Sequence, residues 1–284
     1  ANHMVINALV KRTDNMVCVL PTYQQHYSIP RAIGADVRIL KLRLENDYLP
    51  DLDELRSLVD KNTKMITINN PNNPTGSWIP RETLEAIRDI AAEADAYVLS
   101  DEVYRGISED GSYMDSIVDI YEKGISVGSM SKIFSLAGLR MGWIASKSQE
   151  ALHLCLERRD YDTISCGMID DMLASLALAN KEKIFERNRA ILKKNRQILD
   201  DWVNSTPQVH YLRPVAGTTA LVYYDLDMPS YELCKRLIKE KGLLFTPGAA
   251  FEMEGAVRIG YAFDSKLLKE GLDKFTEFLE EESK

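Results

Sequence analysis

The chain has 284 residues, of which 45% are hydrophobic, and a net charge of −8 with an isoelectric point near 5.2. This length predicts about two domains, each able to bury a core of its own. The acidic balance argues against a nucleic-acid or anionic-membrane partner, which needs a basic face, and no apolar run approaches the ~20 residues of a membrane span.

The cysteines indicate a reducing compartment. They are widely spaced, without a Cys-x-x-Cys pair, and lie at Cys18, Cys155, Cys166 and Cys234. Such spacing is typical of neither a metal site nor a disulfide framework. Because no signal-peptide pattern opens the chain either, we expect four reduced core thiols in a cytoplasmic protein.

The first 180 residues alternate between short apolar runs and longer amphipathic stretches. The runs are rich in valine and isoleucine, which predicts buried strands at residues 16–20, 37–42, 65–69, 97–100, 125–128 and 143–145. The clearest helix begins at Pro80, since proline suits a first helical position and Leu84 and Ile87 follow on one face. This alternation predicts an α/β fold with a mostly parallel sheet, whose ligands bind at the carboxyl ends of the strands.

The sequence changes character near residue 180. A long, charge-rich helical stretch covers residues 181–203, and further helices are predicted at 231–241 and 266–282. Strand-like runs lie between them, at 218–225, 244–246 and 256–261. We therefore predict a large domain at residues 1–180 and a small α+β domain at residues 181–284.

Polar side chains follow the first predicted strands, where a ligand would bind. Tyr23 comes just after the strand at 16–20; it either stacks on an aromatic ligand or packs in the core. Asn73 lies in the segment Asn-Asn-Pro-Asn-Asn-Pro-Thr-Gly at residues 69–76, which has the composition of a turn. Its amide could also bond an oxygen on a bound ring.

Asp101 ends a predicted strand in Leu-Ser-Asp-Glu-Val-Tyr-Arg-Gly (99–106), although aspartate is a poor strand former. One interpretation is a surface acid that caps the next turn. The other is a carboxylate that keeps a pyridine nitrogen protonated through a charge-assisted hydrogen bond. Tyr104, three residues on, could donate to a phenolic oxygen of the same ring, whereas Glu102 is interpreted as structural.

Lys132 is the most informative residue of the chain. It lies among small and hydroxyl residues in Ser-Val-Gly-Ser-Met-Ser-Lys-Ile-Phe-Ser-Leu-Ala-Gly-Leu-Arg (126–140), with Ser129 and Ser131 before it and Arg140 after it. An amine beside hydroxyls and a guanidinium suits the capture of an aldehyde that also carries a phosphate. Pyridoxal 5'-phosphate (PLP) has both groups.

Arg258 lies in the apolar run Ala-Val-Arg-Ile-Gly (256–260). A buried arginine needs an anionic partner, so Arg258 could clamp a substrate carboxylate with two hydrogen bonds. The alternative is an edge-strand arginine that points to water.

Together these segments resemble PLP-dependent aminotransferases of the aspartate aminotransferase superfamily (class I and II, fold type I). The likeness covers nearly the whole chain, in the order Pro-Thr-Tyr, Asn-Asn-Pro-Thr-Gly, Ser-Asp-Glu-Val-Tyr, Ser-Met-Ser-Lys with the following arginine, and Val-Arg-Ile-Gly. Each motif alone is weak, but the five in this order are specific. The resemblance implies a three-layer α/β/α large domain, a homodimer, and an exchange of amino groups between an L-amino acid and a 2-oxo acid.

The resemblance also implies a role for each residue around the cofactor ring. Lys132 would form a Schiff base with the PLP aldehyde and then act as general base and acid. Asp101 would pair with the pyridine nitrogen, Tyr104 and Asn73 would bond the phenolic oxygen, and Tyr23 would stack on the ring.

The remaining roles concern the two anionic groups. Ser129, Ser131 and Arg140 would hold the phosphate, although Ser131 could simply line the turn, and Arg258 would clamp the substrate α-carboxylate.

One departure from the family lies at the N-terminus. Members usually carry a further segment before the point where this chain begins, and it contributes to the small domain and to the partner subunit's site. Residues 1–9 look like the helix that follows the family's glycine-rich turn, so Ala1 and Asn2 would belong to the phosphate cup. His3 is interpreted as an ordinary helix-start residue.

Other functions stay open at this point. A PLP-dependent carbon–sulfur β-lyase would share every residue named so far and would differ only in its products. A PLP-sensing regulator would need a basic helix-turn-helix segment, which this chain lacks, and a truncated PLP-binding chain without turnover is the third alternative. Tyr113, Met114 and Tyr161 could face a substrate, but core packing is the prediction for each.

Overall fold

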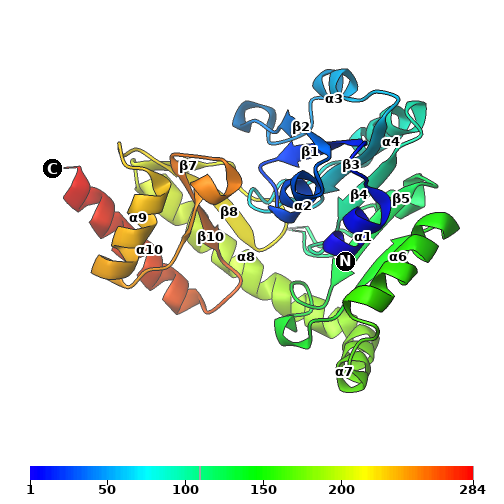
Figure 1. Ribbon diagram of the computed structural model, residues 1–284. Helices are drawn as coiled ribbons and strands as arrows, with labels where there is room; N and C mark the ends of the chain where they lie inside the picture. The colour runs from blue at the N-terminus through cyan, green and yellow to red at the C-terminus, as the bar shows by residue number, and fades with distance from the viewer. Residues whose placement is uncertain (109, 284) are drawn as a thin grey trace.

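The computed structural model describes residues 1–108 and 110–283 and contains two sheets (Figure 1). The larger sheet has the order β2-β1-β3-β4-β5-β6. Its strands are β1 (Asn15–Leu20), β2 (Asp36–Lys41), β3 (Thr63–Asn69), β4 (Tyr97–Asp101), β5 (Gly124–Ser129) and β6 (Gly142–Ser146). The first five pair in parallel and β6 is antiparallel to β5, which confirms the mostly parallel sheet.

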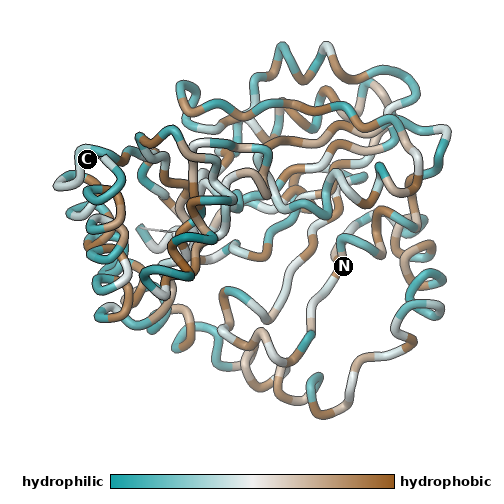
Figure 2. The backbone as a smooth tube through the Cα atoms, turned by 60° about the vertical axis from the view of Figure 1, so that its left-hand side comes forward, coloured by the Kyte–Doolittle hydropathy of each residue, from teal (hydrophilic) through white to brown (hydrophobic). Residues whose placement is uncertain are grey.

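Helices cover both faces of this sheet, because alternate strand residues point to opposite sides. Met16 and Cys18 of β1 pack with α1 (Asn2–Leu9), α2 (Gln25–Ile33) and α6 (Gln149–Asp162). Val17 and Val19 pack with α3 (Leu52–Leu58), α4 (Arg81–Glu93) and α5 (Ile117–Ile120). Figure 2 shows hydrophobic segments along the strands between these layers, and the three-layer α/β/α prediction is confirmed.

Two of the six strands predicted to be buried are partly exposed. They are β2 and β6, the two edges of the sheet, and helices shield an edge strand less completely than a central one. The helix predicted to start at Pro80 is present, with Pro80 as its N-cap and Arg81 as its first residue.

The smaller sheet has the order β7-β8-β10-β9 and is antiparallel throughout. Its strands are β7 (Val209–Tyr211), β8 (Thr219–Tyr224), β9 (Thr246–Pro247) and β10 (Ala256–Gly260). Sequence patterns missed β7. The strand predicted at 244–246 corresponds to β9, which begins two residues later than predicted. The predicted helix at 231–241 is an α-helix, α9 (Ser230–Arg236), followed by a π-helical turn at Leu237–Lys241.

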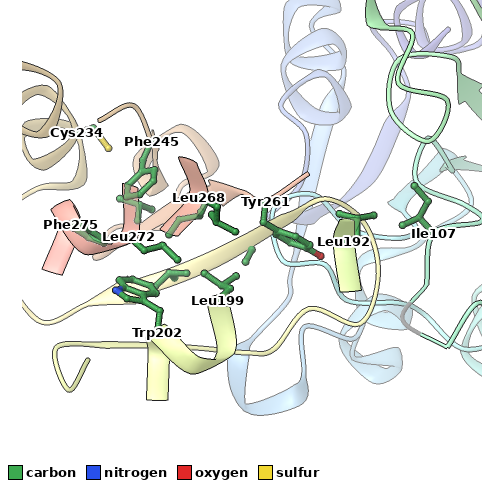
Figure 3. Close-up of a cluster of buried hydrophobic side chains, with 14 of the residues drawn as sticks. Ile107, Leu192, Leu199, Trp202, Cys234, Phe245, Tyr261, Leu268, Leu272 and Phe275 are labelled. Carbon is green, nitrogen blue, oxygen red and sulfur yellow. The ribbon is translucent and has the colours of Figure 1, made fainter. Parts of the chain in front are cut away.

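The core of this second unit forms where α8 (Lys181–Ser205) and α10 (Ser265–Glu282) pack on the sheet (Figure 3). The Trp202 ring stacks on Phe275 with 5.9 Å between centroids, and its Nε1 donates to Thr276 Oγ1 over 2.8 Å. The same core reaches Ile107 of the first unit, so the boundary at residue 180 remains a prediction.

Helix α7 (Met168–Ala179) extends away from the rest of the molecule (Figure 1). Among the described residues, no helix is both long enough and apolar enough to cross a membrane. Three cysteines are buried thiols as expected, but Cys166 is exposed, two residues before α7. Core packing was also wrong for Tyr161 and Tyr113, which are 89% and 51% exposed, and right for Met114.

Candidate functional site

A cavity of about 500 Å³ lies at the carboxyl ends of β3, β4 and β5. The parallel register aligns these ends, pairing Asn69 with Asp101 and Asp101 with Val127. All eleven residues that the sequence singled out line this one cavity: Ala1, Asn2, Tyr23, Asn73, Asp101, Tyr104, Ser129, Ser131, Lys132, Arg140 and Arg258. The structure thus brings together segments up to 257 positions apart.

Asp101 is the only carboxylate among the described residues that line the cavity, and it is 3% exposed. Its Oδ1 accepts from the Val103 backbone N–H over 3.2 Å, which caps the following turn. Its Oδ2 accepts from Asn2 Nδ2 over 2.7 Å and lies 3.5 Å from His26 Nε2. Burial alone would raise the pKa of Asp101, but His26, Asn2 and the Val103 N–H together hold that pKa below its ordinary value.

His26 is a site residue that sequence reasoning missed. It is fully buried in α2, behind Asp101. Its position three residues after Tyr23 was the available signal, but only the packing of α2 against β4 reveals the contact. Asn2 was predicted to join a phosphate cup; its side-chain amide donates to Asp101 in the structure, and a contact of Asn2 with phosphate stays a prediction.

Lys132 lies in the loop that leaves β5, and its side chain extends into the cavity. The loop is held by the Met130 N–H, which donates to the Met141 carbonyl over 3.0 Å, and by the Ser135 N–H, which donates to Lys132 O over 3.1 Å. Desolvation by the surrounding protein and the positive charge of Arg258 lower the pKa of Lys132, more than Asp101 raises it. A larger share of the amine is therefore neutral, and nucleophilic, than in an ordinary lysine.

The end of the cavity beyond Lys132 is built for an anion. Ser129 Oγ donates to Ser131 Oγ over 2.8 Å, and Arg140 Nη1 donates to the Ala137 carbonyl over 2.8 Å and approaches Ser131 Oγ at 3.5 Å. The first turn of α1 begins at the same place and has no side-chain cap. Unpaired backbone N–H groups at a helix start favour a phosphate.

Arg258 reaches the cavity from the smaller sheet, where it lies on β10 between β8 and β9. Because β10 is an interior strand and Arg258 is half-buried, the alternative of an edge-strand arginine that points to water is wrong. Its Nη1 donates to Asn73 Oδ1 over 3.1 Å, its Nη2 donates to Thr246 Oγ1 over 3.0 Å, and its guanidinium lies 5.2 Å from the Phe251 ring centroid. These contacts fix the guanidinium without neutralising it, which leaves its charge for a ligand.

Two tyrosines complete the walls. Tyr104 is buried, and burial raises the pKa of its phenol, although Thr218 and Arg258 act in the opposite direction. The hydroxyl therefore remains a proton donor at neutral pH. Tyr23 is 38% exposed at the cavity, which excludes the alternative of core packing.

The cavity has the charge pattern of a site for a doubly anionic aromatic ligand. Within the described part of the chain, Lys132, Arg140 and Arg258 have no carboxylate within 4 Å, and Asp101 is the single opposing charge on the walls. Two buried polar atoms here, Asn2 Oδ1 and His26 Nδ1, have no hydrogen-bond partner. No group of three metal-ligating side chains occurs among the described residues. The charges and hydrogen-bond donors of this cavity fit PLP.

Known proteins resemble this chain in sequence and in fold. The family model for aminotransferases of class I and II matches residues 1–275. An aspartate aminotransferase of Pyrococcus horikoshii is 29% identical over 99% of this chain and 73% of its own length, and a capreomycidine synthase of Streptomyces vinaceus is 27% identical over 94% and 68%. The solved structure of a PLP-dependent aminotransferase from Streptococcus suis superposes with a TM-score of 0.95 at 44% identity, covering 100% of this chain and 75% of that one.

Proposed function

This chain belongs to the aminotransferase class I and II family, whose members use PLP, and we propose that it exchanges amino groups between an L-amino acid and a 2-oxo acid in the cavity described above. The observation that carries this proposal is the meeting of Lys132 and Asp101 in one cavity, together with Arg140 from the segment between β5 and β6 and Arg258 from β10.

The cavity walls suggest how PLP would be held. Lys132 Nζ would bond covalently to its aldehyde, Asp101 would pair with its ring nitrogen, and Tyr23 would cover its ring. Asn73 Oδ1 is engaged by Arg258, which leaves the Asn73 amide to donate, together with Tyr104, to the phenolic oxygen. Both serines and the start of α1 support Arg140 at the phosphate.

When bound, PLP supplies an electron sink that stabilises negative charge at the substrate Cα. The protein has to orient the substrate and move one proton. Arg258 would hold the α-carboxylate so that Cα lies beside Lys132. Lys132 Nζ, whose pKa is lowered by burial and by Arg258, would take the Cα proton and deliver it two bonds away, to the carbon that carried the PLP aldehyde. Asp101 keeps its negative charge throughout because its pKa is held low.

The test is an absorbance titration of the protein with PLP, followed by a panel of amino acids and 2-oxo acids. We expect a visible band for covalently bound PLP that is lost in Lys132→Ala, and a new amino acid as product. A band that survives in Lys132→Ala refutes the assignment of Lys132. Release of pyruvate and ammonia instead of a new amino acid would establish the β-lyase alternative.

The exposed apolar side chains of α7 support a homodimer. Met168, Ile169, Met172 and Leu176 are each more than 60% exposed, although burial of such side chains is favourable by about 1.5–3 kcal/mol each. A cavity of about 590 Å³ lined by Gly167 shares Ala1 and Arg140 with the PLP site. A second copy bound there would therefore border the phosphate end. Light scattering should give twice the chain mass, and Met172→Lys with Leu176→Lys should halve it; a monomeric wild type refutes the dimer.

A cytoplasmic location is part of the same proposal. All four cysteines are free thiols in the described structure, and Cys166 is exposed to oxidants. A thiol in that position persists best in a reducing compartment.

A further inference from the structure

Residues 23–26, which follow β1, contact three different parts of the molecule. Tyr23 and Gln25 line the PLP cavity, and His26 contacts Asp101 beneath it. Gln24, between them, is not part of the cavity wall, and its Nε2 donates to the Ala250 carbonyl over 2.7 Å. This contact joins residues 226 positions apart and connects the loop on the ring-stacking side of the site to the second sheet.

Ala250 belongs to the segment that holds Arg258. The segment runs from β9 (Thr246–Pro247) through the 3-10 turn Gly248–Phe251. Thr246 accepts from the Arg258 guanidinium at its beginning, and the Phe251 ring packs under that guanidinium at its end. Gln24 thus binds this 246–251 cradle near its end, one residue before the ring that supports Arg258.

We propose that Gln24 is a positioning residue for Arg258: its amide fixes the distance between the Tyr23 loop and the 246–251 cradle, and so the place of the substrate carboxylate over the cofactor ring. The inference rests on the carboxylate-binding role proposed for Arg258. Because the Gln24 contact is half-buried and ends on a backbone carbonyl, it is directional, and loss of the donor would leave the carbonyl unpaired.

A neighbouring ion pair provides a matched control. Arg31 Nη1 lies 3.3 Å from Glu252 Oε1 and bridges the same two parts of the chain, from α2 to the residue after the 3-10 turn. Both side chains are nearly half exposed, and exposed pairs of this kind contribute little. If any contact between these two parts of the chain could position Arg258, removal of the Arg31 charge would weaken substrate binding as much as loss of the Gln24 donor.

The experiment compares Gln24→Met, which keeps the side-chain size but removes the donor, with Arg31→Gln and with Gln24→Lys, which restores a donor. For Gln24→Met we expect the KM for the amino donor to rise about three- to tenfold, as for one lost neutral hydrogen bond, with a smaller change in kcat and unchanged PLP affinity. Arg31→Gln should behave as wild type, and Gln24→Lys should recover most of the lost affinity.

A second readout does not depend on turnover. Propionate, which carries only the carboxylate, is titrated into PLP-loaded protein and followed through the cofactor absorbance. The half-saturating concentration should rise in Gln24→Met by the same factor as KM. Equal values in Gln24→Met and Arg31→Gln overturn the proposal, as does a parallel loss of PLP affinity, which indicates a general structural role. Absence of turnover in the wild type would count against the proposed function, while the propionate titration still decides the role of Gln24.

Discussion

Replacement of Asp101 by asparagine is the sharpest test of the site, because it removes one negative charge and almost no volume. The fold should tolerate the change. In the wild type the Asn2 amide donates to Asp101, while Asn2 Oδ1 lacks a partner. A rotation of the Asn2 amide would turn Oδ1 toward position 101, where it can accept a hydrogen bond from the new asparagine side chain. We therefore expect PLP-free Asp101→Asn to fold like the wild type.

The magnitude follows from burial. Asp101 is 3% exposed, so solvent screens its bond to a protonated ring nitrogen very little. A hydrogen bond to a charged group contributes about 1.5–3 kcal/mol, and about 1.4 kcal/mol corresponds to a factor of ten. PLP affinity should therefore fall about 10- to 150-fold, and turnover by at least as much, because the ring loses its positive charge as well.

The assay is a PLP titration followed by protein fluorescence, together with kcat for the best amino donor. Asp89→Asn, an exposed carboxylate on α4, controls for loss of charge as such. Unchanged PLP affinity and turnover in a folded Asp101→Asn variant would refute the placement of the pyridine nitrogen at this residue.

Three further predictions follow from the same site. In PLP-free protein the pKa of Lys132 should lie below its ordinary value of 10.5 and should rise in Arg258→Met, because Arg258 is the charge that lowers it most; NMR of reductively methylated protein measures both. The native pKa of Asp101 lies below its unfolded value, so its ionisation stabilises the fold above about pH 4 and that contribution is lost as the pH falls further. Below about pH 4, the free energy of unfolding measured with urea should therefore fall more steeply with pH in the wild type than in Asp101→Asn. The same dependence on pH in both proteins would contradict the lowered pKa of Asp101. A Cβ added at Gly128, which lines the cavity, would lie 2.3 Å from the Trp143 ring; Gly128→Ala should cost about 1–3 kcal/mol of unfolding free energy, and Trp143→Ala in the same chain should relieve part of that cost.

Sequence patterns predicted the central strands and the charged residues of the cavity, but not the short strand β7 or the contacts between distant side chains. The central strands were found because they are buried on both faces and read as continuous apolar runs, whereas β7 has only three residues, too few to show a period. Asp101 stood out because aspartate is a poor strand former, and Arg258 because a buried arginine needs an anionic partner. The contacts of His26 and Gln24 could not be predicted, because neither residue conflicts with its local sequence and both partners are set by tertiary packing.

The placement of charge in the cavity bears on the order in which two anionic groups bind, the phosphate of PLP and then the carboxylate of the substrate. Burial comes first among the causes that lower the pKa of Lys132, followed among the positive charges by Arg258 and then by Arg140. A phosphate beside Arg140 would offset the smaller of these two charges and leave the larger one, so the pKa of Lys132, when the amine is freed from the cofactor, would still lie below its ordinary value. A substrate carboxylate would then offset the charge of Arg258 and so raise the pKa of Lys132. The amine would thereby become more basic at the step in which it accepts the proton from Cα. On this argument the substrate itself raises the basicity of the residue that acts on it.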